Sequence, residues 1–225
     1  MKQPIVFLGP SLRPDVAKQY LDARFEPPIK RGDLASLVAE GYDTFGIIDG
    51  EFFQNLSVSP KEILQYIKQG ITFYGSSSMG ALRASELYPF GMIGVGQVYR
   101  HYKSGLIRSD DDVALLFDSV RFRPLSEPLV NMRWAFYSAF KSGVITAAEY
   151  RLLIDQAKRT LYPERVYARV VRSTAGLPPE RAEGLLSWIR EQGQACDLKG
   201  LDAIALLKAL RRRQQRKERN GSWHR

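Results

Sequence analysis

The segment ITFYGSSSMGALRASEL, residues 71–87, decides the fold. Four of its first five residues are β-branched or aromatic, which predicts a short buried strand at residues 71–75. Three serines and a glycine follow, and a helical pattern begins at Ser78 and reaches Leu87. A strand, a tight turn of small residues and a helix in this order predict one βα unit of a parallel sheet.

The chain before residue 71 repeats this alternation. Short apolar runs predict strands at residues 5–9 and 44–49, and a weaker pattern predicts one near residues 24–27. Helical spacing predicts helices at residues 15–21, 33–40 and 60–68, with Asp15, Asp33 and Ser59 as N-caps. The fold class is therefore predicted to be α/β, a Rossmann-like short parallel sheet flanked by helices.

The pattern changes after the serine-rich turn. A glycine-rich segment at residues 90–96 precedes a helix through Lys103, and residues 112–117 are a candidate edge strand. Helices are predicted at residues 128–142, 146–160, 163–174, 178–191 and 200–218. We expect an α/β core domain at 1–135, an all-helical C-terminal region at 136–210 and a disordered basic tail at 211–225.

Composition narrows the class of protein. The chain has 225 residues, of which 44% are hydrophobic, so it is long enough to bury a core. No apolar run approaches the roughly 20 residues of a membrane span, and the early run at residues 5–8 is too short for a signal peptide. Cys196 is the only cysteine, which excludes an intrachain disulfide and a cysteine metal cluster. We expect a cytoplasmic protein that does not contact a membrane.

The net charge of +9 is unevenly distributed along the chain. Residues 211–225 contain seven basic residues and one acidic residue, a net of +6, which leaves +3 for residues 1–210. Such a basic segment is compatible with RNA, with an acidic protein partner, or with solvent alone.

The functional site is expected at one edge of the sheet. Ligands of open parallel sheets bind beyond the carboxyl ends of the strands, where helix-start amides point outward. Three of the predicted strands end there in small or polar residues, at positions 9–12, 49–52 and 75–80. The site is therefore predicted to lie within the first 135 residues or so.

Ser78 is the first candidate within this site. Small residues two before and two after it, Ser76 and Gly80, match the layout of a nucleophile elbow. In that interpretation Ser78 attacks a substrate or contacts an anion, assisted by the amides of Met79 and Gly80. The alternative is that Ser78 is only the N-cap of the helix.

Charged residues supply further candidates. Asp49 ends a strand and is a candidate for acid–base work, or it is a turn residue. Arg83, one turn into the helix, either stabilises an anionic ligand or pairs with Glu86 at i+3. His101, one of two histidines, follows Ser78 by 23 residues on a separate helix, which argues against a Ser-His-Asp triad.

Two later clusters are open to more than one interpretation. Asp111 and Asp112 belong to a run of three acids that either holds magnesium weakly or is solvated. Glu127, Asn131 and Arg133 lie near the start of a long helix, and only the first two share a face. They are functional or form a structural network. The glycines of residues 91–96 lack the spacing of a dinucleotide fingerprint, so NAD is not expected.

Seven motifs in this order resemble the TfuA family, the partners of YcaO enzymes in backbone thioamidation. The motifs are Gly9-Pro10-Ser11-Leu12, Ile48-Asp49-Gly50, Lys61-Glu62-Ile63-Leu64, Gly75-Ser76-Ser77-Ser78-Met79-Gly80-Ala81-Leu82-Arg83-Ala84, Gly91-Met92-Ile93-Gly94-Val95-Gly96, Asp111-Asp112 and Ser126-Glu127-Pro128-Leu129-Val130-Asn131-Met132-Arg133. One departure is that many members have a histidine just before the third motif, where this chain has Ser59-Pro60.

The resemblance implies an accessory role in converting an amide C=O of a peptide or protein substrate into C=S. A YcaO partner would use the ATP, and this chain is expected to bind no cofactor or metal itself. The chain would accept a ThiS-like sulfur carrier with a C-terminal thiocarboxylate and release its sulfur by hydrolysis, which would make it a hydrolase. The alternatives are a noncatalytic adaptor that docks YcaO, its substrate or the carrier, and a phosphate- or nucleotide-binding protein.

Candidate residues for that chemistry follow from the resemblance and from the site at the sheet edge. The catalytic candidates are Ser78, Asp49, Arg83 and Glu127, and the substrate-binding candidates are Ser11, Ser76, Ser77, Met79, Gly80, Asn131 and Arg133. Either Ser78 attacks the thiocarboxylate directly, or Asp49 or Glu127 activates water.

Overall fold

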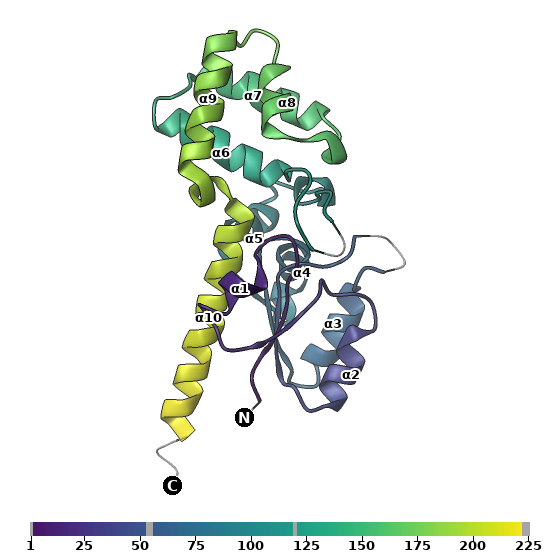
Figure 1. Cartoon of the computed structure of the whole chain (residues 1–225). Coiled ribbons are helices and arrows are strands. Elements are labelled where there is room, and N and C mark those ends of the chain that lie inside the picture. The colour runs from purple at the N-terminus through teal and green to yellow at the C-terminus, as the bar shows by residue number, and fades with distance from the viewer. Residues whose placement is uncertain (1, 53–55, 119–120, 222–225) are drawn as a thin grey trace. The chain divides into compact units, whose positions relative to one another are not determined.

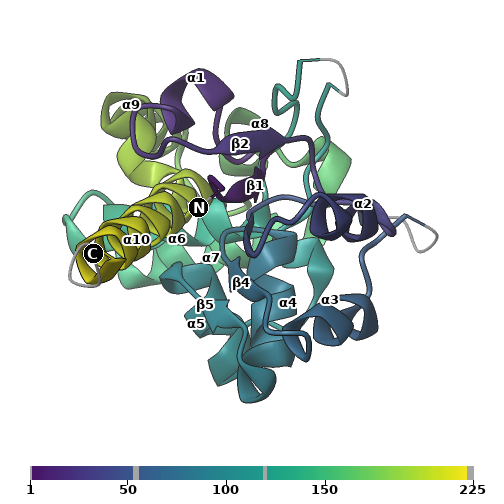
Figure 2. The same cartoon turned by 90° about the horizontal axis from the view of Figure 1, so that it is seen from below.

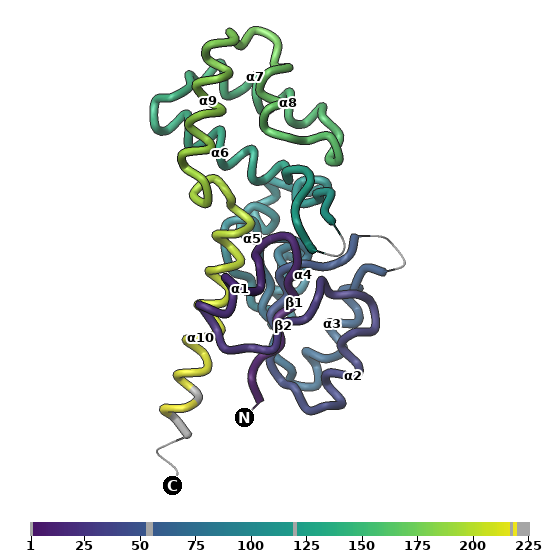
Figure 3. The backbone as a smooth tube through the Cα atoms, in the orientation of Figure 1, coloured from purple at the N-terminus to yellow at the C-terminus, as the bar shows by residue number. Residues whose placement is uncertain are grey.

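The computed structural model describes residues 2–52, 56–118 and 121–221, and the chain forms two compact units (Figure 1). Unit 1 comprises Met1–Arg108 together with Lys199–Arg225, and unit 2 comprises Ser109–Leu198. The predicted domain boundaries at residues 135 and 210 differ from this division. The difference arises because the last helix returns to the core of unit 1, as the path of the chain shows (Figure 3).

Unit 1 contains a parallel sheet, as predicted. Within the described residues the sheet has five strands in the order β2-β1-β3-β4-β5. The strands are β1 (Ile5–Phe7), β2 (Arg24–Glu26), β3 (Thr44–Ile47), β4 (Thr72–Gly75) and β5 (Ile93–Gly94). All neighbours pair in parallel. The predicted α/β fold is confirmed, although β5 was not predicted because its two residues lie in a glycine-rich segment.

Helices cover both faces of this sheet (Figure 2). The helices of unit 1 are α1 (Pro14–Ala17), α2 (Asp33–Ala39), α3 (Pro60–Ile67), α4 (Met79–Leu87), the 3-10 turn Tyr88–Phe90, α5 (Gly96–Ser104) and α10 (Leu198–Gly221). Residues of α2, α3 and α4 bury one face, on which Phe7, Phe45 and Phe73 stack with ring centroids 6.4 and 5.2 Å apart. Residues of α1 and α10 bury the other face.

The predicted helix starts are right at one position and wrong at two. Ser59 caps α3, because its hydroxyl accepts a hydrogen bond of 3.2 Å from the Glu62 amide. Asp15 and Asp33 lie inside α1 and α2, whose N-cap residues make no side-chain cap bond. The Asp33 carboxylate instead accepts the amide of Lys30 in the preceding turn.

The predicted disordered tail is wrong for residues 211–221, because α10 continues through them. Residues 222–225 lie outside the described residues. Extending a helix costs little once its first turns are formed, and here those turns are packed against the sheet. The helical pattern at residues 200–218 therefore predicted this segment correctly, whereas its basic composition gave the wrong expectation.

Unit 2 is helical and has its own core. Its elements are the 3-10 turn Asp110–Asp112, α6 (Leu129–Lys141), α7 (Ala147–Arg159), the 3-10 turn Tyr162–Glu164, α8 (Tyr167–Arg172), α9 (Pro179–Gln192) and the 3-10 turn Gly193–Cys196. Residues of α6 to α9 form one apolar cluster around Phe136 and Leu153. The predicted strand at residues 112–117 is wrong, since its only β pairing in the described chain is an isolated bridge from Phe117 to Pro124. No helix within the described residues is both long and apolar enough to cross a membrane.

Candidate functional site

The strand order places a topological switch point between β1 and β3, where the chain leaves in opposite directions. Asp49 lies there and is 2% exposed. Its carboxylate accepts hydrogen bonds from the Gly9 amide at 2.8 Å, the Ser11 amide at 3.1 Å and the Ser11 hydroxyl at 2.6 Å. A carboxylate has about four acceptor positions, so about one remains for a water or a substrate proton. Asp49 therefore ties two loops together at the point where such sheets bind ligands.

The serine turn between β4 and α4 lies beside this switch point. The Ser78 amide donates to the Ile48 carbonyl at 3.3 Å and to the Ser76 carbonyl at 2.8 Å. A Cβ placed on Gly50 would lie 2.8 Å from Met79 Cγ. The loop that contains Asp49 and the turn that contains Ser78 are thus neighbours, as predicted from their common edge of the sheet.

The conformational strain of the turn falls on Ser77. Its φ is +66°, and its buried hydroxyl has no hydrogen-bond partner within the described residues. Ser78 has φ −119° and ψ −120° and does not cap α4 with its side chain. The N-cap interpretation of the Ser78 hydroxyl is therefore not what the structure shows. The sharp bend lies one residue earlier than the spacing of Ser76 and Gly80 predicted.

Gly80 has a packing role that differs from its predicted role as an anion donor. Its amide donates to the Ile48 carbonyl at 3.3 Å. A Cβ on Gly80 would lie 1.7 Å from the Ile47 carbonyl oxygen, so the start of α4 is seated directly on β3. Because this amide is already engaged, the geometry also gives little support to a phosphate or nucleotide cradle at this turn.

Arg83 pairs with Glu86, which is the second of its two predicted roles. The distance from Nη1 to the Glu86 carboxylate is 2.8 Å. The Nε group donates to the Val58 carbonyl at 2.8 Å, and Nη2 donates to the Ser57 hydroxyl at 3.1 Å. Arg83 therefore fixes the loop before α3, and all three of its donor groups are engaged away from the serine turn.

The second cluster of predicted residues lies in unit 2. Asp112 pairs with Arg133 at 3.3 Å, and the Asn131 amide group donates to the Asp197 carboxylate at 2.9 Å. The Glu127 backbone amide donates to the Arg165 carbonyl at 2.6 Å. The structural-network interpretation of Glu127, Asn131 and Arg133 therefore fits these contacts.

Asp111 and Asp112, the weak magnesium candidates, each form an ion pair with an arginine. Asp111 pairs with Arg165 at 2.9 Å, and Asp112 pairs with Arg133. Each carboxylate therefore has a cationic partner already. No cluster of three or more potential metal ligands occurs in the described part of the chain.

Two further titratable residues are Tyr167 and His101. The pKa of Tyr167 is raised well above its ordinary value, mainly by burial and secondly by the Glu127 carboxylate. His101 lies half-buried on α5.

Asp202 is a polar residue of the site region that sequence reasoning missed. Its carbonyl accepts the Ser76 hydroxyl at 2.8 Å, and its carboxylate accepts the amides of Gln97 and Val98 at 2.9 and 2.7 Å. Gly96 has φ +93°, and a Cβ there would lie 2.2 Å from the Asp202 carboxyl carbon. Asp202 therefore joins α10 to the serine turn and to the start of α5.

The buried Asp202 is expected to make the stability of unit 1 depend on pH. Burial raises its pKa from 3.8 to about 6. Between these values the native state holds a proton that the unfolded chain has lost, so this group's contribution to stability falls as pH rises from about 4 to 6. A rise in the pKa from 3.8 to about 6 corresponds to about 3 kcal/mol of stability at most.

Denaturant unfolding at pH 4, 5, 6 and 7 checks this expectation. The difference in unfolding free energy between the wild type and Asp202→Asn should change by about 2–3 kcal/mol across the series. The same difference for Asp155→Asn, an exposed aspartate on α7, should stay nearly constant. Parallel pH curves for the wild type and Asp202→Asn would contradict the raised pKa.

The fold and the site define an α/β protein whose polar residues gather at the switch point of a doubly wound sheet. The chain belongs to the TfuA-like protein family, since the family's model matches residues 49–166. This match covers 118 of 225 residues, and it includes Asp49, the serine turn and the segment from Glu127 to Arg133. It begins after the Gly9 motif and extends beyond residue 133, where the resemblance by motifs ended. No curated protein matches the chain.

Proposed function

We propose that the protein is the accessory partner of a YcaO enzyme in peptide or protein backbone thioamidation. In this role it accepts a ThiS-like carrier that ends in a thiocarboxylate and releases the sulfur by hydrolysis. Membership in the TfuA-like family supports the accessory role. The observation that carries the hydrolytic step is the serine turn, where a strained backbone holds the buried and unpaired Ser77 hydroxyl next to Ser78.

The strain is informative because it costs stability. A left-handed φ at a residue other than glycine costs about 1–3 kcal/mol, and a buried hydroxyl without a partner costs about 1–3 kcal/mol. Natural proteins keep such costs mainly where function requires them. Ser77 and Ser78 together form a bend at the carboxyl edge of the sheet, beside the Asp49–Ser11 hydrogen bond. A ligand that accepts hydrogen bonds would satisfy the hydroxyl of Ser77.

A thiocarboxylate is such a ligand. It is a delocalised anion and a poor electrophile, so donors must offset its charge before its carbonyl carbon can be attacked. A donor aimed at the developing oxyanion contributes about 3 kcal/mol in comparable sites. In the reaction, water adds to the carbonyl carbon, the C–S bond breaks, and the products are a carboxylate, hydrosulfide and one proton. Asp49 has an acceptor position for that proton.

Two routes lead to these products. In the first, Asp49 takes a proton from the attacking water. In the second, the Ser78 hydroxyl attacks, hydrosulfide leaves, and water then hydrolyses the resulting ester. Hydroxylamine added during turnover would trap the carrier as a hydroxamate only in the second route, so this measurement separates the two.

Sulfide release from a thiocarboxylated carrier tests the proposal. We expect release by the wild type and a loss of about 100-fold or more in Ser78→Ala, because removal of one site donor typically costs that much. The matched control is Ser85→Ala on the same helix, whose hydroxyl donates to the Leu82 carbonyl, and it should stay within twofold of the wild type. Absence of release by the wild type would end the hydrolytic proposal, and undiminished release by Ser78→Ala would remove the serine from it.

Burial of the serine turn favours the adaptor as the second candidate function. Ser76 and Ser77 are 0% exposed and Ser78 is 2% exposed. A noncatalytic adaptor needs no access to these side chains. Thioamidation by YcaO that proceeds at full rate with Ser78→Ala and Asp49→Asn, both folded, would select the adaptor over the hydrolase.

A further inference from the structure

The net charge of the protein is concentrated on α10. Residues 198–221, which form α10, contain eight basic and two acidic residues, a net of +6. Residues 1–108 contain twelve basic and ten acidic residues, a net of +2. Unit 2, residues 109–198, contains twelve of each and is neutral. One helix therefore carries most of the excess positive charge.

The two halves of α10 differ in their surroundings. Ala203, Leu206, Leu207 and Leu210 are buried against the sheet, and they anchor the first half. Residues 211–221 continue the helix for about 16 Å at 1.5 Å per residue, past the sheet (Figure 1). The anchored half holds the second half in position, so its side chains are presented on a preformed helix.

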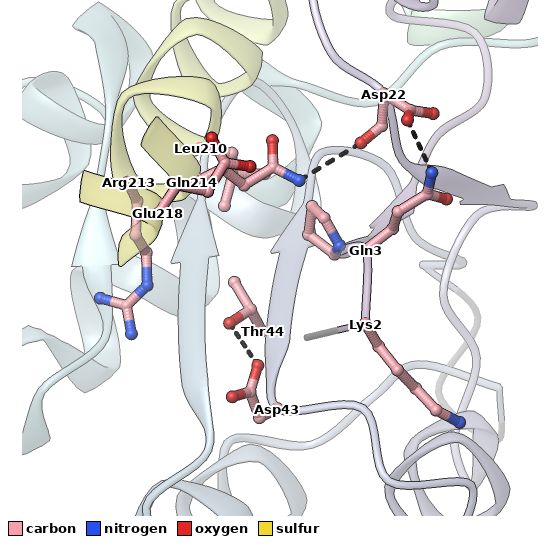
Figure 4. A pocket seen from close by; sticks show the side chains of 10 residues that line it. Lys2, Gln3, Asp22, Asp43, Thr44, Leu210, Arg213, Gln214 and Glu218 are labelled. Carbon is pink, nitrogen blue, oxygen red and sulfur yellow. Dashed lines mark hydrogen bonds between the residues drawn. The ribbon is translucent and has the colours of Figure 1, made fainter. Parts of the chain in front are cut away.

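One side of the second half also contacts the rest of unit 1. Arg213 donates to the Thr72 hydroxyl at 2.8 Å, and Gln214 donates to the Asp22 carbonyl at 3.4 Å. Both residues line a pocket of about 180 Å³ that Gln3 also lines (Figure 4). These contacts determine which side of the helix faces the sheet and which side faces outward.

The outward side carries cations and an amide. Arg211, Arg212, Gln215 and Arg216 are exposed, as are Glu218 and Arg219 further along the helix, and Arg219 falls within the same arc as the first four. Arg211, Arg212 and Arg216 take part in no ion pair within the described residues. At about 100° per residue the first four side chains cover an arc of about 140°, with Arg211 and Arg216 at its edges and the other two between them. Cations thus flank a central arginine and glutamine.

This arrangement matches the major groove of duplex DNA. The groove is about 12 Å wide, admits an α-helix of about 10–12 Å diameter, and has phosphates along both walls. Arginines at the edges of the arc would meet the two walls, while Arg212 and Gln215 would face base edges, which arginine and glutamine bind in bidentate fashion. The major groove of regular duplex RNA is too narrow for such a helix.

The same residues fit a protein partner poorly. Residues 211–219, RRRQQRKER, contain no apolar side chain. Protein–protein interfaces need buried aromatic or aliphatic anchors at their centre, whereas protein–DNA interfaces are more polar and much more positive. Helix stabilisation alone explains the basic residues only in part, because the macrodipole acts on charges within the last turn.

We propose that the second half of α10, residues 211–221, binds duplex DNA in the major groove. This interaction does not depend on the sulfur chemistry proposed for the serine turn. The protein would bind DNA mainly through contacts from arginine side chains to the phosphate backbone of the DNA. Contacts to base edges would come from Arg212 and Gln215.

Fluorescence anisotropy with the full chain and a labelled 20-base-pair duplex tests this proposal. We expect a dissociation constant of about 1–100 μM, and a slope of log K against log salt of about −2, because Arg211 and Arg216 would each neutralise one phosphate. The triple variant Arg211→Gln, Arg212→Gln and Arg216→Gln should bind at least tenfold more weakly, with a slope near zero. Glutamine favours helix, and circular dichroism checks that the variant is folded.

The matched control removes the same charge elsewhere. Arg151, Arg159 and Arg190 are exposed arginines of unit 2, and their replacement by glutamine also lowers the net charge by three. This control should bind as the wild type does. Equal weakening by both triple variants would overturn the proposal, because net charge alone would then explain binding. Equal or tighter binding to duplex RNA of the same sequence, to single-stranded DNA or to polyglutamate would also overturn it. If the α10 triple variant does not fold, Arg212→Gln alone should weaken binding at least threefold, and no effect would contradict the groove geometry.

Discussion

Replacement of Gly80 by alanine is expected to destabilise unit 1 by about 3–5 kcal/mol. The added Cβ would lie 1.7 Å from the Ile47 carbonyl oxygen and 2.6 Å from its carbon. Both atoms belong to the backbone of a central strand, so they cannot move aside as a flexible side chain would. The start of α4 would have to lift from β3, and the hydrogen bond from the Gly80 amide to Ile48 would be strained or lost.

Urea unfolding of the wild type and of Gly80→Ala measures this effect. The control is Gly184→Ala, in the interior of α9, where a Cβ meets no atom within 4 Å. That substitution should stabilise by about 0.5–1 kcal/mol, because glycine loses more freedom on folding than alanine. An unchanged unfolding midpoint for Gly80→Ala would mean that α4 does not sit on β3 in this way.

Gly80 also illustrates how far the sequence alone could reach. A small residue two positions after a serine correctly indicated a tight strand–turn–helix connection. Its purpose was inferred to be ligand contact, whereas the structure shows packing on the Ile47 carbonyl. The spacing was the same for both purposes. The pattern therefore predicted the turn, and only the three-dimensional contact distinguished the two reasons for a glycine.

Local patterns predicted the elements better than their partners. Three of the four predicted strands, β1, β3 and β4, are compact apolar or aromatic runs, which is why they could be predicted. In contrast, β2 has one apolar residue between two charged ones, and β5 has two residues, one of them glycine. The amphipathic pattern of α10 predicted a helix, but a helical pattern does not say which surface it covers. The contact between Ser76 and Asp202 joins residues 126 positions apart, and one sequence holds no signal for it.

The same contrast between local position and tertiary partner holds for the predicted site residues. Asp49 and the serine turn come together because strand ends of a parallel sheet share an edge. Arg83 was placed on the correct helix, but the loop of Ser57 and Val58 engages its guanidinium. The position of that loop depends on tertiary packing, which residue spacing along α4 does not reveal.

Replacement of Arg165 by methionine is expected to destabilise unit 2 by about 3–5 kcal/mol. Arg165 is 1% exposed, and its guanidinium reaches the Asp111 carboxylate at 2.9 Å and the Thr160 carbonyl at 3.0 Å. It also donates to the carbonyls of Ala157 and Asp111, each at 3.3 Å. Methionine fills similar space but donates no hydrogen bond, so three backbone carbonyls and one carboxylate would lose their donor. The ion pair itself contributes less than these bonds, because the Asp111 side chain is 45% exposed and water screens it.

Arg169→Met is the matched control for this substitution. Arg169 lies on α8, pairs with Glu164 at 3.0 Å, and its side chain is 59% exposed, so its loss should cost no more than about 1 kcal/mol. Unfolding of both variants in urea, followed by the fluorescence of Trp134 and Trp188 in unit 2, makes the comparison directly. If Arg165→Met cost as little as Arg169→Met, the buried guanidinium would not be what holds the 3-10 turn Asp110–Asp112 against the end of α7. A large cost would instead identify this arginine as the residue that joins Asp111 to the end of α7.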